Sequence, residues 1–238
     1  MAESSRSRSR SPGQGPLSVF PFLADNEFES ACRAFLDRVH AVKSSRLRWS
    51  SIRLQSAGPI LKISKSLTSG SNPQHGASAV PTHSEGVCDQ MLENREEDSE
   101  ALARKFDTYD SLQVDYDIVL SATYQVPVLY FVLRHEGKLL GIDEVYRYLV
   151  PNQYRENVKG VGIMGGISFG YHPVFGTPAF FVHPCNTADA MKDIASGRDL
   201  PPEAYLIIWL GLVGNCLSLD LPSELFAAEG NPQLKSVN

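Results

Sequence analysis

The chain has 238 residues, of which 42% are hydrophobic and 21% charged, an ordinary soluble composition with room for one domain and a sizeable core. Its net charge of -5 argues against a dominant nucleic-acid surface, which needs a clustered excess of Lys and Arg. The N-terminus has no apolar signal core, and the longest apolar stretch, 204–219, is too interrupted and too short to predict stable membrane insertion.

The four cysteines have no regular spacing, which in a chain of this length does not predict a disulfide framework. We therefore expect a reducing, cytoplasmic environment. No metal site is predicted, because the histidines near Cys88 are scattered. The glycines of 160–165 fit a dinucleotide-binding pattern, but β-prone residues follow them instead of a helix, so no cofactor is predicted.

Composition divides the chain into one domain with loose segments. Residues 1–16 hold Ser-Arg pairs and Pro12-Gly13, which predict a disordered tail more readily than an RNA-linked or phosphorylated segment. Residues 66–106 are rich in Ser, Gly and Pro and then acidic, which predicts a long mobile insertion. We expect the folded domain at 17–222 and a second tail at 223–238.

The first predicted helix spans about 28–42, where apolar residues recur at helical spacing, with Asp25 or Asn26 as its cap. Cys32 lies on the apolar stripe and is predicted to be a core residue. Strand-like runs follow at 47–54 and 59–64. Seven basic residues and no acidic one lie between Arg38 and Lys65, predicting either a solvated face or a docking surface for an acidic partner.

Three strands and three helices are predicted in the second half of the chain. Clean alternation over 113–120 indicates a half-buried strand, and the apolar run 126–133 a strand covered on both faces, antiparallel to the first because the link is short. A short helix is expected over 142–149, ending at Pro151. A strand at 178–182 precedes a helix capped by Asn186, and a buried helix is predicted over 204–217, with Cys216 in the core.

Cys185 is the candidate nucleophile. It lies in the run His183-Pro184-Cys185-Asn186-Thr187, between the last apolar strand and a helix, where partial exposure and the helix dipole favour the thiolate. Hydrolysis, disulfide exchange and acyl carriage all use such a thiol. Disulfide exchange lacks a second nearby cysteine, and hydrolysis lacks a visible charge-relay arrangement. Acyl carriage needs only an exposed sulfur and room for two partner proteins.

Three neighbours of the thiol are candidate supporting residues. In an extended segment, His183 points to the same side as Cys185 and is either a base for the thiol or a structural hydrogen-bond donor. Asn186 and Thr187 either donate to an oxyanion or cap the helix.

These residues carry a resemblance to a known family. The segment His172-Pro-Val-Phe-Gly-Thr-Pro-Ala-Phe-Phe-Val-His-Pro-Cys185 resembles the active-site segment of the autophagy E2-like conjugating enzymes. The run 124–131 resembles their central strand and 205–210 their final helix. The resemblance covers roughly 110–222.

This resemblance implies an α+β fold in which a four-stranded antiparallel sheet packs against helices. It implies that Cys185 accepts a ubiquitin-like modifier, autophagy protein twelve, from an E1-like enzyme as a glycyl thioester. The acceptor would be a lysine of autophagy protein five, reached by proximity without a dedicated E3, in support of autophagosome formation. Ubiquitin E2 enzymes carry His-Pro-Asn upstream of the cysteine, whereas here His172-Pro173 precedes Val174.

Three other functions remain open on the sequence. The sister enzyme that transfers a ubiquitin-like modifier to phosphatidylethanolamine shares the His-Pro-Cys segment, but begins with an amphipathic membrane-sensing helix in place of a Ser-Arg tail. A non-catalytic interaction module with an incidental cysteine is the second alternative. A cysteine protease is the third.

Overall fold

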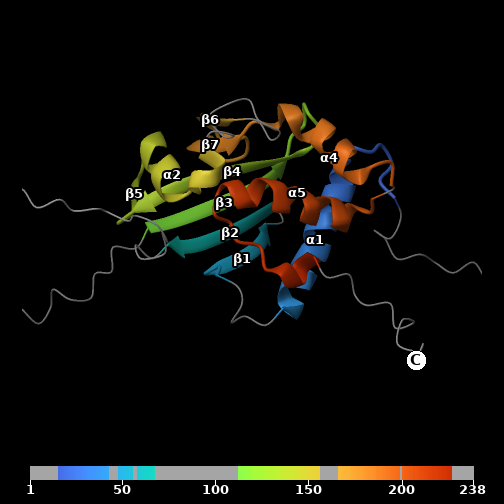
Figure 1. The fold of residues 1–238 in the computed structure, drawn as a ribbon, viewed down its shortest axis with the longest axis horizontal. Helices are drawn as coiled ribbons and strands as arrows, with labels where there is room; N and C mark the ends of the chain where they lie inside the picture. The colour runs from blue at the N-terminus through green and yellow to red at the C-terminus, as the bar shows by residue number, and fades with distance from the viewer. Residues whose placement is uncertain are drawn as a thin grey trace, which may run out of the picture.

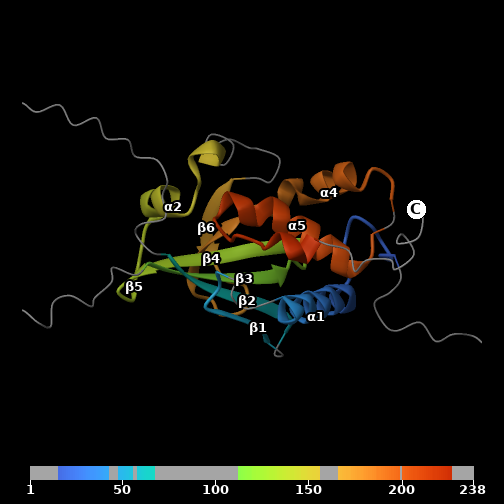
Figure 2. The ribbon, with the colours of Figure 1, turned by 60° about the horizontal axis from the view of Figure 1, so that its bottom comes forward.

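A computed structural model describes residues 16–42, 48–55, 58–67, 112–155, 166–198 and 200–226. In these residues the strands form one seven-stranded antiparallel sheet in the order β1-β2-β3-β4-β7-β6, with β5 paired to β4. Helices α1 and α5 lie on one side of the sheet (Figure 1, Figure 2). The predicted N-terminal tail up to residue 15, the insertion beyond Leu67, the glycines of 160–165 and the C-terminal residues after Phe226 lie outside the described residues.

The strands are β1 Ser51–Gln55, β2 Ile60–Leu67, β3 Leu112–Leu120, β4 Pro127–His135, β5 Lys138–Leu139, β6 Ile167–Tyr171 and β7 Pro178–Val182. The helices are α1 Asp25–Ala41, α2 Ile142–Tyr148, α4 Thr187–Ala195 and α5 Pro202–Cys216, with short 3-10 turns at η2 Asn152–Tyr154, η3 Pro184–Asn186 and η4 Ser223–Phe226.

The pair β3 and β4 forms the centre of the sheet. The two strands pair in antiparallel register from Leu112 with His135 to Leu120 with Pro127, as the short link between them predicted. The outward residues Tyr130 and Val132 of β4 are only half-buried. The expectation that this strand is covered on both faces is therefore wrong, because the helices cover the inner face and a groove of about 390 Å³ stays open on the outer one.

Helix α1 buries the predicted apolar stripe, and Phe28, Cys32 and Phe35 are all 0% exposed. Its predicted cap is wrong, because the helix begins at Asp25 and Ala24 occupies the cap position. The Glu27 carboxylate reaches back and accepts the backbone N–H of Ala24 at 2.9 Å, so the N–H of the cap residue has a partner.

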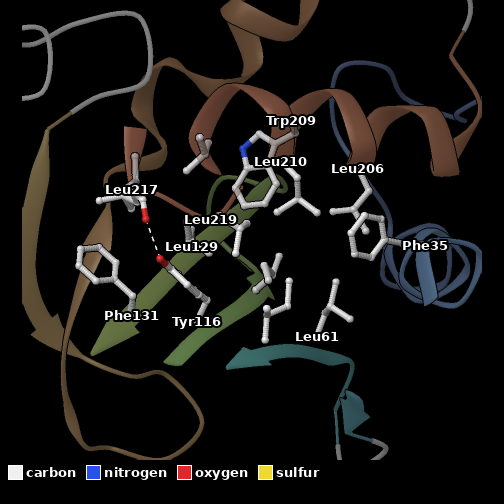
Figure 3. Packing of buried hydrophobic residues seen from close by; sticks show 14 of the residues in the cluster. Phe35, Leu61, Tyr116, Leu129, Phe131, Leu206, Trp209, Leu210, Leu217 and Leu219 are labelled. Carbon is white, nitrogen blue, oxygen red and sulfur yellow. Dashed lines mark hydrogen bonds between the residues drawn. The ribbon is translucent and has the colours of Figure 1, made fainter. Parts of the chain in front are cut away.

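The core lies between α5 and the inner face of β2, β3 and β4. Trp209 and Leu210 of α5 pack above Leu61 and Tyr116, all of them nearly inaccessible to water (Figure 3). The hydroxyl of Tyr116 donates to the carbonyl oxygen of Leu217 at 2.6 Å. The predicted buried helix near the C-terminus is confirmed, and its end is anchored to the sheet.

Two lysines of the basic stretch are engaged inside the fold. Lys65 is 5% exposed and donates to the carbonyl of Ser218 at 2.6 Å and to Asp220 at 2.5 Å. Lys62 pairs with Asp117 at 2.5 Å. These pairs stabilise the sheet and the segment after α5, so neither lysine belongs to a purely solvated face. The docking surface stays a prediction for the rest of the stretch.

The predicted α+β class, an antiparallel sheet packed against helices, is confirmed. Strands β1 to β4 form a four-stranded unit in sequential order, and β7, β6 and β5 extend it. The extension has a functional consequence, because β7 pairs with β4 and runs directly into the segment that holds Cys185.

Candidate active site

The position of the site is set by the β6–β7 hairpin. The two strands pair from Ile167 with Val182 to Tyr171 with Pro178, and β7 joins the sheet through Tyr130 with Phe181 and Phe131 with Phe180. Ala179, Phe180 and Val182 are buried. Because these apolar side chains anchor β7, the residues that follow it leave the sheet at a defined point.

Cys185 lies in the 3-10 turn η3, immediately before α4, and its side chain is exposed. The Nδ1 atom of His183 accepts the backbone N–H of Cys185 at 3.2 Å and so caps the turn. Asn186 occupies the cap position of α4, as predicted, but its side chain makes no cap hydrogen bond. The reason is that η3 continues directly into α4, which moves the exposed N–H groups upstream to Cys185.

The imidazole of His183 lies between two aromatic rings. Tyr124 meets it edge-on at 5.8 Å between ring centroids, and Phe181 lies 6.2 Å away. Because Nδ1 accepts a backbone N–H, only Nε2 remains for a hydrogen bond to solvent or substrate. The structure therefore gives His183 the structural role as an acceptor, whereas the sequence suggested a donor.

The other two predicted residues flank the thiol in different environments. Thr187 is 2% exposed, and its backbone N–H donates to the carbonyl of Pro184, which closes η3. The two roles predicted for its side chain, donor to an oxyanion and cap of the helix, stay predictions. Asn186 is half-buried beside the exposed Cys185. Its role in the chemistry stays a prediction.

The remaining described cysteines are poorly suited to nucleophilic chemistry. Burial raises the pKa of Cys32 to about 12, and Glu29 adds to the effect. Burial also raises the pKa of Cys216, whose thiol contacts the carbonyl of Leu212 at 3.6 Å. Cys88 lies outside the described residues. Among Cys32, Cys185 and Cys216, only Cys185 is exposed.

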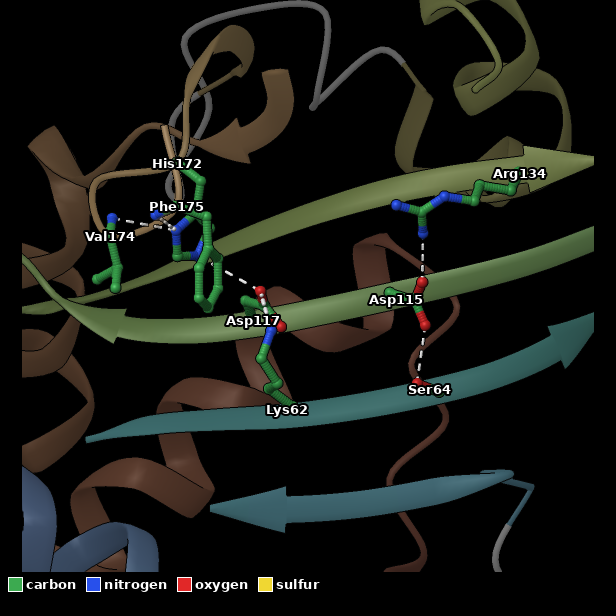
Figure 4. Close-up of polar contacts among 8 residues, drawn as sticks. All are labelled: Lys62, Ser64, Asp115, Asp117, Arg134, His172, Val174 and Phe175. Carbon is green, nitrogen blue, oxygen red and sulfur yellow. Dashed lines mark hydrogen bonds and ion pairs between the residues drawn. The ribbon is translucent and has the colours of Figure 1, made fainter. Parts of the chain in front are cut away.

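His172, the histidine of the His-Pro-Val run, lies away from the thiol. His172 begins the turn that precedes β7, whereas Cys185 follows β7. The five residues of this strand span roughly 13 Å, at about 3.3 Å per residue. His172 is buried, its Nδ1 accepts the backbone N–H of Val174, and its Nε2 lies 3.4 Å from Asp117 (Figure 4). This turn is therefore too distant to supply an oxyanion donor to Cys185.

Two features of the site do not follow from the sequence. Tyr124 precedes an apolar strand, and only the structure shows that its ring contacts His183. The pairing of Lys62 with Asp117 beside His172 is the second, because strand register decides it. The place of Tyr124 in the short link before β4 could have indicated a functional residue, because a large aromatic side chain in a link stays partly exposed. In the structure Tyr124 is 42% exposed.

The sequence matches a family described as "Autophagocytosis associated protein, active-site domain" over residues 27–224. The chain belongs to this family. The matched range contains the whole sheet, α5 and the segment around Cys185.

Curated relatives in the family are conjugating enzymes. The chain is 41% identical over 138 residues to the ubiquitin-like-conjugating enzyme ATG10 of Gibberella zeae, covering 57% of each protein. It is 28% identical over 208 residues to human ATG10, covering 84% of the chain and 91% of the human protein. The Arabidopsis thaliana ATG10 is 32% identical over 117 residues, 47% of the chain and 51% of that protein. The chain thus spans little more than half the length of the fungal and plant relatives.

Two solved structures are also similar. One, titled "Crystal structure of Autophagic E2, Atg10", has a TM-score of 0.47 at 13% identity, covering 84% of this chain and 99% of that one. The other, "Solution structures of KmAtg10", has a TM-score of 0.43 at 12% identity, covering 84% and 98%.

The resemblance to the autophagy E2-like conjugating enzymes, drawn from the segment 172–185, is therefore confirmed at the level of the family. Within the described ranges, no helix of this family member is long and apolar enough to cross a membrane. Nor do three or more His, Cys, Asp or Glu side chains gather around a potential metal position in the part of the chain that the structure describes.

Proposed function

We propose that this E2-like family member carries a ubiquitin-like modifier as a glycyl thioester on Cys185 and transfers it to a lysine of an acceptor protein. The modifier we propose is autophagy protein twelve, delivered by an E1-like enzyme, and the acceptor is autophagy protein five. The proposed setting is the cytoplasm. The family membership of the chain supports the reaction class.

The observation that carries the proposal is the setting of Cys185. Its thiol is exposed, whereas Cys32 is buried and Cys216 half-buried, and it lies on a turn held by the sheet through β7 and capped by His183. A thioester carrier needs this combination, because the sulfur must be reached by two partners while the backbone beneath it stays fixed.

The chemistry divides into two balanced exchanges. The Cys185 thiolate attacks the modifier's thioester on the E1-like enzyme, the cysteine of that enzyme leaves, and a new thioester forms. The acceptor lysine, as the free amine, then attacks the same carbonyl, an amide forms, Cys185 leaves as thiolate, and the amine releases one proton to water. His183 caps the turn that carries the sulfur, and Tyr124 contacts the ring of His183.

The test is adduct formation with the E1-like enzyme, ATP and the modifier, read on a non-reducing gel. Wild type should give an adduct that reducing agent removes, Cys185→Ala none, and Cys185→Ser an oxyester that resists reducing agent. Cys216→Ser is the matched control and should behave as wild type. An absence of adduct with wild type, or an adduct that persists in Cys185→Ala, contradicts the proposal.

Lysine transfer is tested separately from lipid transfer. The charged protein is given either the acceptor protein or liposomes that contain phosphatidylethanolamine. Conjugation of the acceptor supports the proposal. Conjugation of the lipid instead would favour the sister reaction, which shares the His-Pro-Cys segment.

A further inference from the structure

A buried histidine holds the turn between β6 and β7. His172 is 3% exposed, and its Nδ1 atom accepts the backbone N–H groups of Val174 at 3.2 Å and Phe175 at 3.4 Å. Its backbone N–H and C=O pair with Thr177 and Gly176, each at 2.8 Å. Because Nδ1 accepts two N–H groups, it carries no proton, and the ring proton of neutral His172 is on Nε2.

The other side of the ring faces a charged pair. Nε2 lies 3.4 Å from Oδ2 of Asp117, longer than a strong hydrogen bond, and Asp117 is paired with Lys62 at 2.5 Å (Figure 4). The titratable groups that face His172 are thus Lys62 on β2, Asp117 on β3 and Tyr130 on β4. Burial lowers the pKa of His172, Asp117 opposes this, and Lys62 adds to it.

A row of ring contacts joins this cluster to the thiol. His172 lies 5.0 Å from Tyr130, and Tyr130 lies 5.3 Å from Phe181. Phe181 lies 6.2 Å from His183, which caps the Cys185 turn. Phe181 belongs to β7, a strand of five residues, and His172 and His183 lie in the chain on either side of this strand. The turn at His172 is therefore connected to the residue before the thiol turn both through β7 and through these ring contacts.

We propose that neutral His172 is a positioning residue for the thioester site, and that its protonation releases the β6–β7 turn and slows transfer from Cys185. The inference rests on the thioester chemistry proposed above. His172 acts through β7 and the ring contacts and does not touch the reacting atoms. Protonation would place a donor at Nδ1 against the two N–H groups of Val174 and Phe175, so both hydrogen bonds would be lost.

The direction of the pH effect follows from the burial. A histidine whose pKa is lowered in the folded state binds protons less readily than in the unfolded chain. Its contribution to stability is therefore fully present above the unfolded pKa of about 6.5 and is lost as the pH falls from there through the lower pKa of the folded state. Transfer should weaken as the pH falls through the lowered pKa of folded His172, which lies below about 6.5.

The experiment measures single-turnover discharge of the preformed thioester to the acceptor between about pH 5.5 and 8. His172→Asn places an amide oxygen near Nδ1 and cannot be protonated, whereas His172→Gln reaches toward Asp117 but not the turn. Near pH 7.5, we expect His172→Asn to discharge within about threefold of wild type and His172→Gln about tenfold slower. The rate ratio of His172→Asn to wild type should rise as the pH falls.

The ratio cancels the pH dependence that the acceptor amine and Cys185 contribute to both proteins. His40→Asn, exposed on α1, is the matched control and should follow wild type throughout. Circular dichroism at each pH confirms that the compared proteins are folded. A ratio that stays flat with pH, or equal losses in His172→Asn and His172→Gln, would overturn the inference.

A second variant covers the case in which His172→Asn does not fold. Asp117→Asn removes the charge that favours protonation of His172, so the acidic loss of transfer should move to lower pH. An unchanged pH profile would contradict the proposal. If wild type forms no thioester at neutral pH, the proposed function fails at Cys185 itself, which is a separate result from a flat ratio.

Discussion

The Nδ1 atom of His183 accepts the backbone N–H of Cys185 at 3.2 Å. The hydrogen bond fixes the first N–H of the turn that carries the thiol and orients the imidazole with it. The histidine two residues before the nucleophile is therefore a backbone cap, and a simple base-and-thiol pair through Nδ1 is not available. The backbone geometry of the turn therefore organises the site.

Replacing His183 tests this cap. His183→Ala removes the acceptor, and loss of a cap costs about 1 kcal/mol, which corresponds to roughly a fivefold lower population of the ordered turn. We expect thioester formation to slow about fivefold. His183→Asn retains an acceptor and should lose less, while Lys192→Ala on the exposed side of α4 should have no effect. Equal losses in the two His183 variants would contradict the capping role.

Thiol accessibility gives a second prediction, for native-state alkylation in a Cys88→Ser background. Cys185 should react with iodoacetamide first, because Cys32 is buried with its pKa raised to about 12 and Cys216 is half-buried. Mass spectrometry of peptides over time measures the order. In denaturant the three rates should converge. Native labelling of Cys32 as fast as Cys185 would contradict the described burial.

The sheet was largely predictable because periodicity reports burial directly. Alternation over 113–120 and the apolar runs at 126–133 and 178–182 became β3, β4 and β7. The cap of α1 was not predictable from residue type, because Glu27 reaches back to the cap while Asp25 is already within the helix. The residue types alone cannot decide whether Ala24, Asp25 or Asn26 takes the cap position.

The site was predictable at Cys185 and less so around it. A strand-to-helix junction places a thiol at the surface, and this depends only on chain order. The separation of His172 from Cys185 depends on β7 being an extended strand between them, and the contact of Tyr124 with His183 depends on how β4 and β7 pair. The first relationship follows from the strand predicted at 178–182, whereas the second is long-range and is not encoded by spacing in the sequence.

Tyr124 offers a third prediction. Its ring meets His183 edge-on at 5.8 Å, and such contacts contribute about 0.5–1.5 kcal/mol. Tyr124→Ala should therefore slow discharge to the acceptor by roughly two- to tenfold while leaving the melting temperature nearly unchanged, because the side chain is 42% exposed. Tyr148→Ala, similarly exposed on α2, is the control. Equal rates in both variants would show that the ring contact has no role.

The anchor between β3 and the end of α5 gives a prediction for stability. The buried hydroxyl of Tyr116 donates to the carbonyl of Leu217 at 2.6 Å, and Tyr116→Phe leaves this carbonyl without its partner. An unsatisfied buried acceptor costs about 1–3 kcal/mol, so the midpoint of urea unfolding should fall while its slope stays constant. Tyr148→Phe, on the exposed surface, should leave the midpoint unchanged. A Tyr116→Phe protein as stable as wild type would contradict a stabilising role for this hydrogen bond and leave the segment after α5 to its contacts with Lys65, Trp49 and Leu149.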